Sequence, residues 1–395
     1  MGKYNFDDIV PRRGTNSYKW DTPADGVLPM WVADMDFRTA PCIIDALRRR
    51  VEHGIFGYVR VPQAYYDSVI NWFSTRHGAH FERDWFIYTS GVVPALSAIL
   101  KALTRPGDKV IVQPPVYNCF FSSIRNNGCV MLQSRLIQNG LSWSMDFDDL
   151  EAKAADPDAK VMILCNPHNP AGRVWTEEEL RRVGDICLRH NVFVVSDEIH
   201  CELTYPEHDY TPFASLGEEF RLHSATCISP SKAFNIAGLQ IANIVTANNE
   251  IRALIDKAIN INEVCDVNPF GVEATIAAYT PDGAQWLDEL RLLDDEQVAQ
   301  QVVRSGVAKG YGAARIRQML YEKRIPRELW DMALEALPPQ HDAIDEFLQK
   351  RFRGAKPDPK ELKRATDALL RRGHSWSDIR SALERYVPED ELPGE

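Results

Sequence analysis

Residues 227–238, CISPSKAFNIAG, place one lysine, Lys232, among small and apolar residues directly after a run with the character of a buried strand. A lysine in such a setting loses hydration of its ammonium group, which favours the neutral, nucleophilic amine. Taken alone, a lysine is more often a solvated surface charge. Its place after a strand matters, because ligands of α/β proteins bind at the carboxyl ends of the strands.

The sequence around this stretch alternates short apolar runs with longer helical segments. Residues 176–190 form a predicted helix that opens with Thr176 and Glu179 in capping-box spacing. Near-continuous apolar runs are typical of strands buried on both faces. These runs are DKVIVQPP (108–115), AKVMILCNP (159–167), NVFVVSDEIH (191–200), ATCISPSK (225–232) and QIANIVTAN (240–248). The repeated strand–helix–strand order predicts an α/β fold with a mostly parallel sheet.

The composition of the 395-residue chain is that of a globular protein, with 45% hydrophobic and 26% charged residues. A polar N-terminus and the lack of a long apolar run predict a cytoplasmic protein without membrane contact. The eight cysteines all precede residue 266 without a CxxC pair, which argues against a metal site and a disulfide scaffold. The net charge of −11 belongs entirely to residues 1–290, and this acidity argues against direct nucleic-acid binding.

The strand pattern ends near residue 290, and the rest of the sequence predicts helices only. Residues 315–337 and 364–386 superpose at a shift of 49 to 50 residues, which predicts a repeat of short helix triplets. The aligned pairs are Leu320 with Leu370, Leu329 with Ile379, and Ala333 with Leu383.

Three polar residues, Asn169, Asp197 and Lys232, follow successive predicted strands. Each alone is more often a turn residue, a helix cap or a surface charge. Together they match what pyridoxal 5'-phosphate requires: a lysine for the covalent link, a buried carboxylate for the pyridine nitrogen and a donor for the ring oxygen. A helix start for the phosphate is offered by TSGVVPAL (89–96).

The chain resembles the fold-type I pyridoxal phosphate enzymes, and among them the MalY/PatB group of cystathionine and cysteine-S-conjugate β-lyases, from near its start to about residue 290. The motifs that carry this resemblance are RRGTNSYKWD (12–21), LPMWVADMDF (28–37), GIFGYVRVP (54–62), TSGVVPAL, QPPVYNCF (113–120), NPHNPAGRVW (166–175), SDEIHCEL (196–203) and SPSKAFNIAGLQ (229–240). The resemblance implies β-elimination from a small sulfur amino acid to a thiol, pyruvate and ammonia. An aminotransferase remains the minor alternative.

The resemblance also implies site roles. Lys232 is the catalytic lysine linked to the cofactor, Asp197 is the partner of the ring nitrogen, and Tyr117 stacks on the ring, with a core aromatic as the plainer interpretation of Tyr117. Tyr58 reaches the cofactor phosphate of a neighbouring subunit, which implies a homodimer. The remaining cofactor contacts are Asn169 and His200 at the ring hydroxyl, and Gly91, Val92, Ser229 and Ser231 at the phosphate.

Residues 291–388 resemble the RecX family of RecA regulators, through DDEQVAQQVVRS (294–305) and KGYGAARIRQMLYEKRI (309–325). The first of the three RecX repeats has no counterpart. The segment stands where the lyases carry a C-terminal small domain with an arginine for the substrate carboxylate. The expected organisation is therefore a small-domain segment (1–45), a cofactor-binding large domain (46–290) and RecX-like triplets (291–390).

Two further alternatives follow from this join. The chain is either a working lyase fused to a regulatory module, or a RecA-binding regulator of recombination whose pyridoxal phosphate domain is catalytically impaired. A natural fusion, an assembly artefact and an engineered join would all produce this sequence. The basic residues that would face an acidic partner or DNA are Lys309, Arg315, Arg317, Lys323 and Arg324, although the even charge balance favours a solvated helix face.

Overall fold

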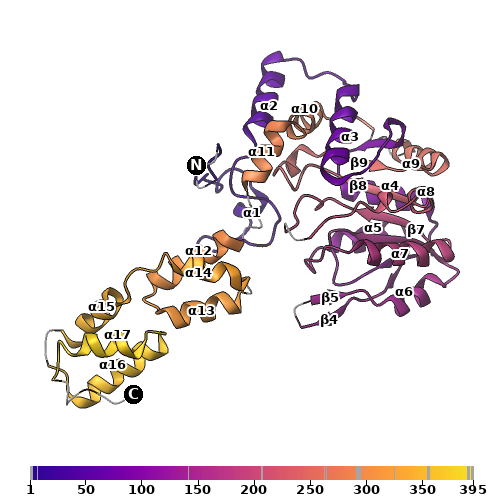
Figure 1. The fold of residues 1–395 in the computed structure, drawn as a ribbon. Coiled ribbons are helices and arrows are strands. Elements are labelled where there is room, and N and C mark those ends of the chain that lie inside the picture. The colour runs from indigo at the N-terminus through magenta and orange to yellow at the C-terminus, as the bar shows by residue number, and fades with distance from the viewer. Residues whose placement is uncertain are drawn as a thin grey trace. The chain divides into compact units, whose positions relative to one another are not determined.

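The computed structural model describes residues 3–6, 8–140, 142–205, 208–261, 263, 265–290, 295–323, 325–353, 356–388 and 392. The chain divides into two compact units, residues 1–292 and residues 293–395, which we call the sheet unit and the helical unit (Figure 1). Within the described ranges, no helix combines the length and apolarity needed to cross a bilayer. The predicted division of the sheet unit at residue 45 stays a prediction.

A seven-stranded sheet organises the sheet unit, in the order β1-β9-β8-β7-β6-β2-β3. Neighbours from β3 to β8 pair in parallel, whereas β9 is antiparallel to both β8 and β1. The strands are β1 (Phe86–Thr89), β2 (Lys109–Val112), β3 (Val130–Gln133), β6 (Ala159–Cys165), β7 (Phe193–Asp197), β8 (Ser224–Ile228) and β9 (Ala242–Val245). A separate hairpin joins β4 (Ile137–Asn139) and β5 (Ser142–Ser144). The predicted, mostly parallel sheet is confirmed.

Helices cover both faces of this sheet, because alternate strand residues enter two different apolar cores. Within β6, Val161 and Ile163 belong to one core, and Met162 and Leu164 belong to the other. The first core contains residues of α4 (Val92–Leu103), α5 (Asn118–Asn126) and α9 (Asn249–Ile261), and the second contains residues of α6 (Phe147–Ala154), α7 (Glu177–Arg189) and α8 (Glu218–Leu222).

The predicted capping box at the start of α7 is present. The Glu179 backbone N–H donates to Thr176 Oγ1 at 3.2 Å, and the Thr176 N–H donates to Glu179 Oε2 at 2.9 Å.

A third core lies under the N-terminal segment, where Phe6 and Phe37 contact Trp286. It joins that segment to α2 (Pro41–His53), α3 (Gln63–His77), α10 (Pro269–Ala278) and α11 (Pro281–Leu290). The remaining short helices of the sheet unit are α1 (Tyr18–Asp21), η1 (Arg83–Trp85), η2 (Phe213–Ser215) and η3 (Ala237–Leu239).

The helical unit consists of two helix triplets in the part that the structure describes, each with its own apolar core. The first triplet contains α12 (Asp295–Ala308), α13 (Ala313–Glu322), η4 (Arg327–Leu329) and α14 (Trp330–Leu334); the second contains α15 (Gln340–Phe352), α16 (Pro359–Arg371) and α17 (Trp376–Leu383). The predicted pairing of Leu320 with Leu370 is wrong by one residue. Leu320 and Leu369 are fully buried, whereas Leu370 is 44% exposed.

Main-chain atoms join the two triplets. The Gly312 N–H donates to the Arg372 carbonyl at 2.8 Å, and the Ala314 N–H donates to the Gly373 carbonyl at 3.1 Å. A Cβ added at Gly312 would lie 2.2 Å from the Gly373 carbonyl oxygen. The contact therefore depends on the absence of side chains at these glycines.

Candidate active site

One edge of the sheet collects the predicted site residues. Because β1 and β8 both run antiparallel to β9, they point the same way as β2, β6 and β7. The strand ends that meet there lead into the segments that hold Gly91, Tyr117, Asn169, Asp197 and Lys232. Sheet topology thus brings together residues that lie up to about 140 positions apart in the sequence.

Asp197 is the last residue of β7 and lies between Cys165 of β6 and Cys227 of β8. It is only 4% exposed, and its Oδ1 accepts a hydrogen bond from the Ile199 N–H at 3.2 Å. Burial, with a smaller contribution from the neighbouring Glu198, raises the pKa of this carboxyl to about 7, although the hydrogen bond from Ile199 and the Lys232 charge oppose the rise. A carboxylate buried in this way is stabilised by a cationic or N–H partner.

Lys232 follows β8 and is half-buried. Its Nζ donates a long hydrogen bond, 3.4 Å, to the carbonyl of Ala33 in the N-terminal segment. His200 lies near enough to sense the same ammonium: burial, helped by the Lys232 charge, lowers the pKa of His200 to about 4. The imidazole of His200 is therefore neutral near pH 7.

The start of α4 has the properties of an anion site. The N-cap residue of this 12-residue helix is Gly91, which has no side chain to cap it. The first backbone N–H groups, from Val92 onward, therefore receive no hydrogen bond from a capping side chain. The Ser229 hydroxyl instead donates to the Ile241 carbonyl at 2.6 Å and accepts from the Ser231 N–H at 3.1 Å. These bonds shape the loop before Lys232.

Tyr117 and Tyr58 differ sharply in their surroundings. Tyr117 is half-buried at the N-cap of α5, and burial and contact with Cys119 raise its pKa, with a further contribution from the Asp197 charge. Tyr58 lies between α2 and α3 and is 97% exposed. Within this chain the structure brings Tyr117, but not Tyr58, close to Asp197.

Two buried glutamates beside the site were not predicted. Glu198, which is fully buried, accepts hydrogen bonds from the Ser196 hydroxyl at 2.7 Å and the Phe213 N–H at 2.9 Å, and also one from the Tyr210 hydroxyl. Burial raises the pKa of Glu198. The glutamate holds the two ends of the segment between β7 and η2, which contains His200.

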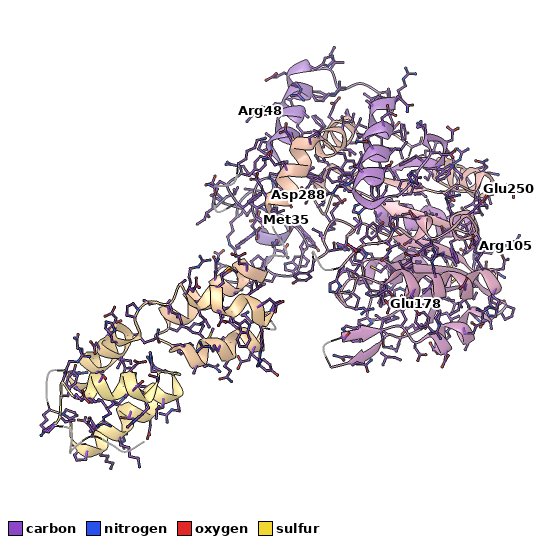
Figure 2. The ribbon with its side chains drawn as sticks, viewed as in Figure 1. Met35, Arg48, Arg105, Glu178, Glu250 and Asp288 are labelled. Carbon is purple, nitrogen blue, oxygen red and sulfur yellow. The ribbon has the colours of Figure 1, made fainter. Side chains whose placement is uncertain are left out.

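Glu202 fastens the same segment to α3. Its carboxylate accepts hydrogen bonds from Trp72 Nε1 at 2.6 Å and Arg76 Nε at 3.1 Å, and contacts His77 Nε2 at 2.7 Å. Arg76 also binds Asp288 of α11 at 3.1 Å. Figure 2 labels Asp288. Burial alone would raise the pKa of Glu202, but these partners bring it below its usual value. In the sequence, the one feature that points to these two glutamates is their presence in the motif SDEIHCEL (196–203).

Glu202 also lies in a cluster with His77 and Cys201, whose ligand atoms are within 4.8 Å of one another. The Arg76 guanidinium and the His77 ring already occupy both carboxylate oxygens. Glu202 thus belongs to an ion-pair network that runs through Arg76 to Asp288.

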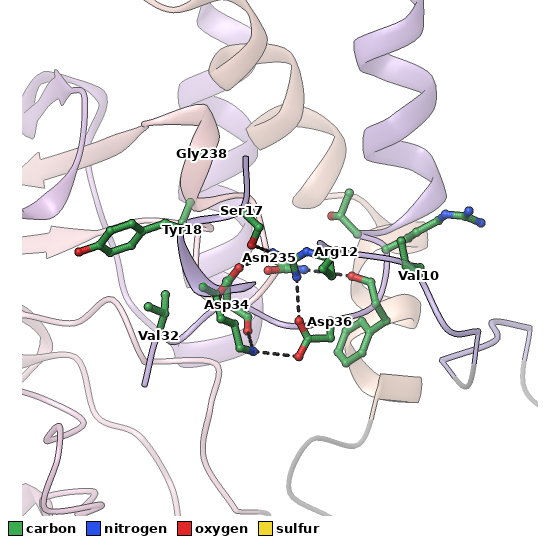
Figure 3. A pocket seen from close by; sticks show the side chains of 14 residues that line it. Val10, Arg12, Ser17, Tyr18, Val32, Asp34, Asp36, Asn235 and Gly238 are labelled. Carbon is green, nitrogen blue, oxygen red and sulfur yellow. Dashed lines mark hydrogen bonds and ion pairs between the residues drawn. The ribbon is translucent and has the colours of Figure 1, made fainter. Parts of the chain in front are cut away.

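A cavity of about 500 Å³ lies between the N-terminal segment and the loop after Lys232 (Figure 3). Arg12 Nη2 binds Asp34 Oδ2 at 2.7 Å, and its Nη1 binds Asp36 Oδ1 at 2.9 Å. Lys19 binds Asp36 Oδ2 at 2.9 Å, so each of the two aspartates in the cavity wall has a basic partner there.

Comparison with known proteins gives two separate matches. The family described as aminotransferase class I and II matches residues 26–292, and the second and third three-helix domains of RecX match residues 294–334 and 340–383.

Three relatives illustrate the first match. Cystathionine beta-lyase PatB of Bacillus subtilis is 46% identical over 291 residues, 72% of this chain and 75% of that protein. Protein MalY of Escherichia coli is 35% identical over 296 residues, 73% of this chain and 75% of that protein. The solved structure of a PLP-bound C-S lyase from Staphylococcus hominis is 33% identical, with a TM-score of 0.70, and the alignment covers 77% of this chain and 78% of that one.

Proposed function

This chain belongs to the aminotransferase class I and II family, and we propose that its sheet unit is a pyridoxal phosphate-dependent carbon–sulfur β-lyase. The observation that carries the proposal is the presence of a buried acid and a lysine at one sheet edge: Asp197, whose pKa burial raises to about 7, and Lys232, whose charge acts on Asp197. Among its relatives, PatB is named a cystathionine beta-lyase, and the S. hominis protein a PLP-bound C-S lyase.

The residues present fit pyridoxal phosphate. Asp197 would hold the ring nitrogen, Asn169 would donate to the ring oxygen with His200 close by, and Tyr117 would pack on the ring. The cofactor, when bound, supplies an electron sink for the bond-breaking steps. The residues that would hold its phosphate are Gly91, Val92, Ser231 and, through its place in the same loop, Ser229.

Proton transfer is the part of the reaction that falls to this chain. The free amine of Lys232 takes the Cα proton of a bound cysteine S-conjugate or cystathionine, and the Cβ–sulfur bond then breaks. The sulfur leaves as a thiol, and the three-carbon remainder hydrolyses to pyruvate and ammonia. Because the pKa of His200 is lowered to about 4, its imidazole is neutral near pH 7 and adds no positive charge near the ring oxygen.

The proposed enzyme is a cytoplasmic homodimer. Apolar side chains stand on the surface between α2 and α3, with Ile55 66% exposed, Phe56 55% exposed and Tyr58 97% exposed. A second copy that covers this segment would bring Tyr58 to the phosphate of its partner. The exposed patch supports an interface of this kind.

The helical unit is the second candidate, because both of its triplets match RecX domains. We propose that it binds RecA. Lys309, Arg317 and Lys323 are exposed, whereas Arg315 pairs with Glu322 at 3.3 Å, and Arg324 lies outside the described residues. RecA binding by the full chain that survives in the Lys232→Ala variant would support this role, and failure to bind RecA or change its strand exchange would oppose it.

The lyase proposal is tested with pyridoxal phosphate added to the full chain. Borohydride reduction followed by peptide mass spectrometry should find the pyridoxyl group on Lys232. Pyruvate release from L-cystathionine should then fall by roughly 100- to 10,000-fold in Lys232→Ala. Pyruvate release that persists unchanged in this variant would refute the proposal, and keto-acid-dependent amino transfer would favour the aminotransferase alternative.

A further inference from the structure

We propose that Asn235 is a positioning residue that docks residues 33–37 onto the loop carrying Lys232 and so sets the distance between Lys232 and the Ala33 carbonyl. This inference deepens the proposed function, on which its catalytic part rests. Asn235 lies only three residues after Lys232, and its partners lie 200 positions away in the N-terminal segment.

Three hydrogen bonds define the docking. Asn235 Oδ1 accepts from the Met35 N–H at 2.9 Å, and Asn235 Nδ2 donates to the carbonyls of Met35 at 3.1 Å and Phe37 at 3.0 Å. These partners fix the orientation of the amide, since a flipped amide would face the Met35 N–H with its own NH₂ group. The Asn235 side chain therefore binds the backbone of residues 35–37 as the main chain of a neighbouring β-strand would.

The backbone conformation at Asn235 belongs to the same arrangement. Its φ of 55° is in the left-handed region, which asparagine tolerates better than most residues. One residue earlier, the Phe234 carbonyl accepts a hydrogen bond from Thr39 Oγ1 at 2.6 Å, so the docking continues beyond Phe37. The turn after Lys232 thus faces the N-terminal segment with both main-chain and side-chain groups.

Arg12 holds the same segment. Its Nη1 donates to the Met35 carbonyl at 2.7 Å, and its two ion pairs go to Asp34 and Asp36, on either side of Met35 (Figure 3). Residues 34–36 are consequently held by both Arg12 and Asn235. Ala33 directly precedes them, and its carbonyl is the acceptor of the Lys232 hydrogen bond.

The chemical consequence concerns the amine that moves the proton. An amine held by a fixed acceptor has one preferred direction for its lone pair, and a displacement of about 1 Å is enough to reduce a rate by roughly 100-fold. Asn235 touches neither substrate nor cofactor in this proposal. It acts through Ala33 on Lys232.

The test compares Asn235→Gly with Asn235→Asp. Glycine keeps the left-handed backbone and removes all three side-chain bonds. Aspartate keeps the shape and the acceptor for Met35 but turns two donors into acceptors that face carbonyl groups. Asn191→Gly is the matched control, because Asn191 has φ 54° on an exposed turn before β7.

Hydrogen exchange on the cofactor-free full chain is the first readout. Asn235→Gly should speed exchange at the Met35 amide at least tenfold, Asn235→Asp, which keeps the acceptor, should speed it less, and Asn191→Gly should leave it unchanged. The second readout is the rate at which added pyridoxal phosphate becomes fixed to Lys232 by borohydride, which should fall in both variants. The third is the lyase reaction, where kcat should fall by about tenfold or more.

Each result has a defined meaning. Unchanged exchange at Met35 would show that Asn235 does not hold the segment, and faster exchange with an unchanged rate of Lys232 modification would show that the segment does not position Lys232. Either result overturns the proposal. Absent lyase activity in the unmutated chain would refute the proposed function alone, because exchange and Lys232 modification do not depend on turnover.

Discussion

The sheet unit and the helical unit differ in what they bury. Among the described residues, the buried polar side chains all belong to the sheet unit except Thr366 and His374. Thr366 donates to the Leu362 carbonyl of its own helix, and His374 contacts the Gly310 carbonyl at 3.2 Å. Among the described residues, the hydrogen-bond partners of these two buried side chains are therefore backbone carbonyls of the helical unit.

The sheet unit, in contrast, buries whole carboxyl groups at the end of β7. Asp197, Glu198 and Glu202 lie within six residues of each other, and burial is the first influence on the pKa of each. A buried carboxyl is costly unless other groups bind it, and it is retained where chemistry or docking uses it. Buried carboxyl groups therefore distinguish the sheet unit, where we place the chemistry, from the helical unit, where we place recognition of a partner.

The largest expected effect tests this contrast at Asp197. Asp197→Asn removes the buried charge, and we expect it to weaken pyridoxal phosphate binding by about 30-fold or more, because losing one partner of a buried charge pair costs about 2–5 kcal/mol. Titration of the cofactor absorbance measures this. Asp146→Asn is the control, since Asp146 caps α6 and asparagine caps equally well.

The same substitution should have the opposite effect on the cofactor-free protein. The folded carboxyl titrates near pH 7 and the unfolded one near 3.8, so the folded state binds the extra proton between these values and stability falls as pH rises through this window. Asp197→Asn should therefore stabilise the cofactor-free chain at pH 8 by up to about 4 kcal/mol. Melting temperatures are measured for both proteins from pH 4 to pH 8. A difference in melting temperature that stays the same at all pH values would contradict the raised pKa of Asp197.

A smaller effect is expected at the second buried carboxylate. Glu202→Gln breaks the ion pair with Arg76 and weakens the contact with His77, and we expect a loss of about 2 kcal/mol in unfolding free energy, since a buried charged partner is lost while Arg76 keeps only Asp288. Urea unfolding measures the loss. Glu151→Gln removes a surface pair with Arg189 and should change little. Equal losses in the two variants would remove the distinction between buried and surface charge.

The last effect, of similar size, lies in the helical unit, where packing rather than charge decides. Leu369→Ala should cost about 2–3 kcal/mol, because Leu369 is fully buried in the core of the second triplet. Its neighbour Leu370, at 44% exposed, is a matched control that should cost less than about 0.5 kcal/mol. Unfolding of the helical unit followed by circular dichroism measures both losses. A larger loss in Leu370→Ala than in Leu369→Ala would restore the pairing of Leu320 with Leu370.

Local sequence information accounts for most of the fold. The apolar runs before Asn169, Asp197 and Lys232 predicted the strands that bring them to one edge, because burial on both faces leaves a continuous signal. The runs FIYT of β1 and VMLQ of β3 were missed; they are the two edge strands of the sheet, and Val130 of β3 is 48% exposed.

The rest of the site depends on contacts between distant residues. Glu202 meets Trp72 across 130 positions, and Asn235 meets Met35 across 200. Neither asparagine nor glutamate carries a local signal for such a partner. The adjacent leucines 369 and 370 show the same limit on a smaller scale, because either residue satisfies a helical repeat until the neighbouring helices are placed.

The contact of Gly312 with the Gly373 backbone has a consequence for how the helical unit can change over time. The two triplets are held together by main-chain hydrogen bonds at Gly312 and Ala314 and by the buried His374 side chain, which contacts the Gly310 carbonyl. Surface substitutions can therefore alter what the triplets recognise and leave their geometry as it is. The exposed residues of the triplets can therefore change during evolution without altering how the triplets pack, provided that Gly312 and Gly373 are kept.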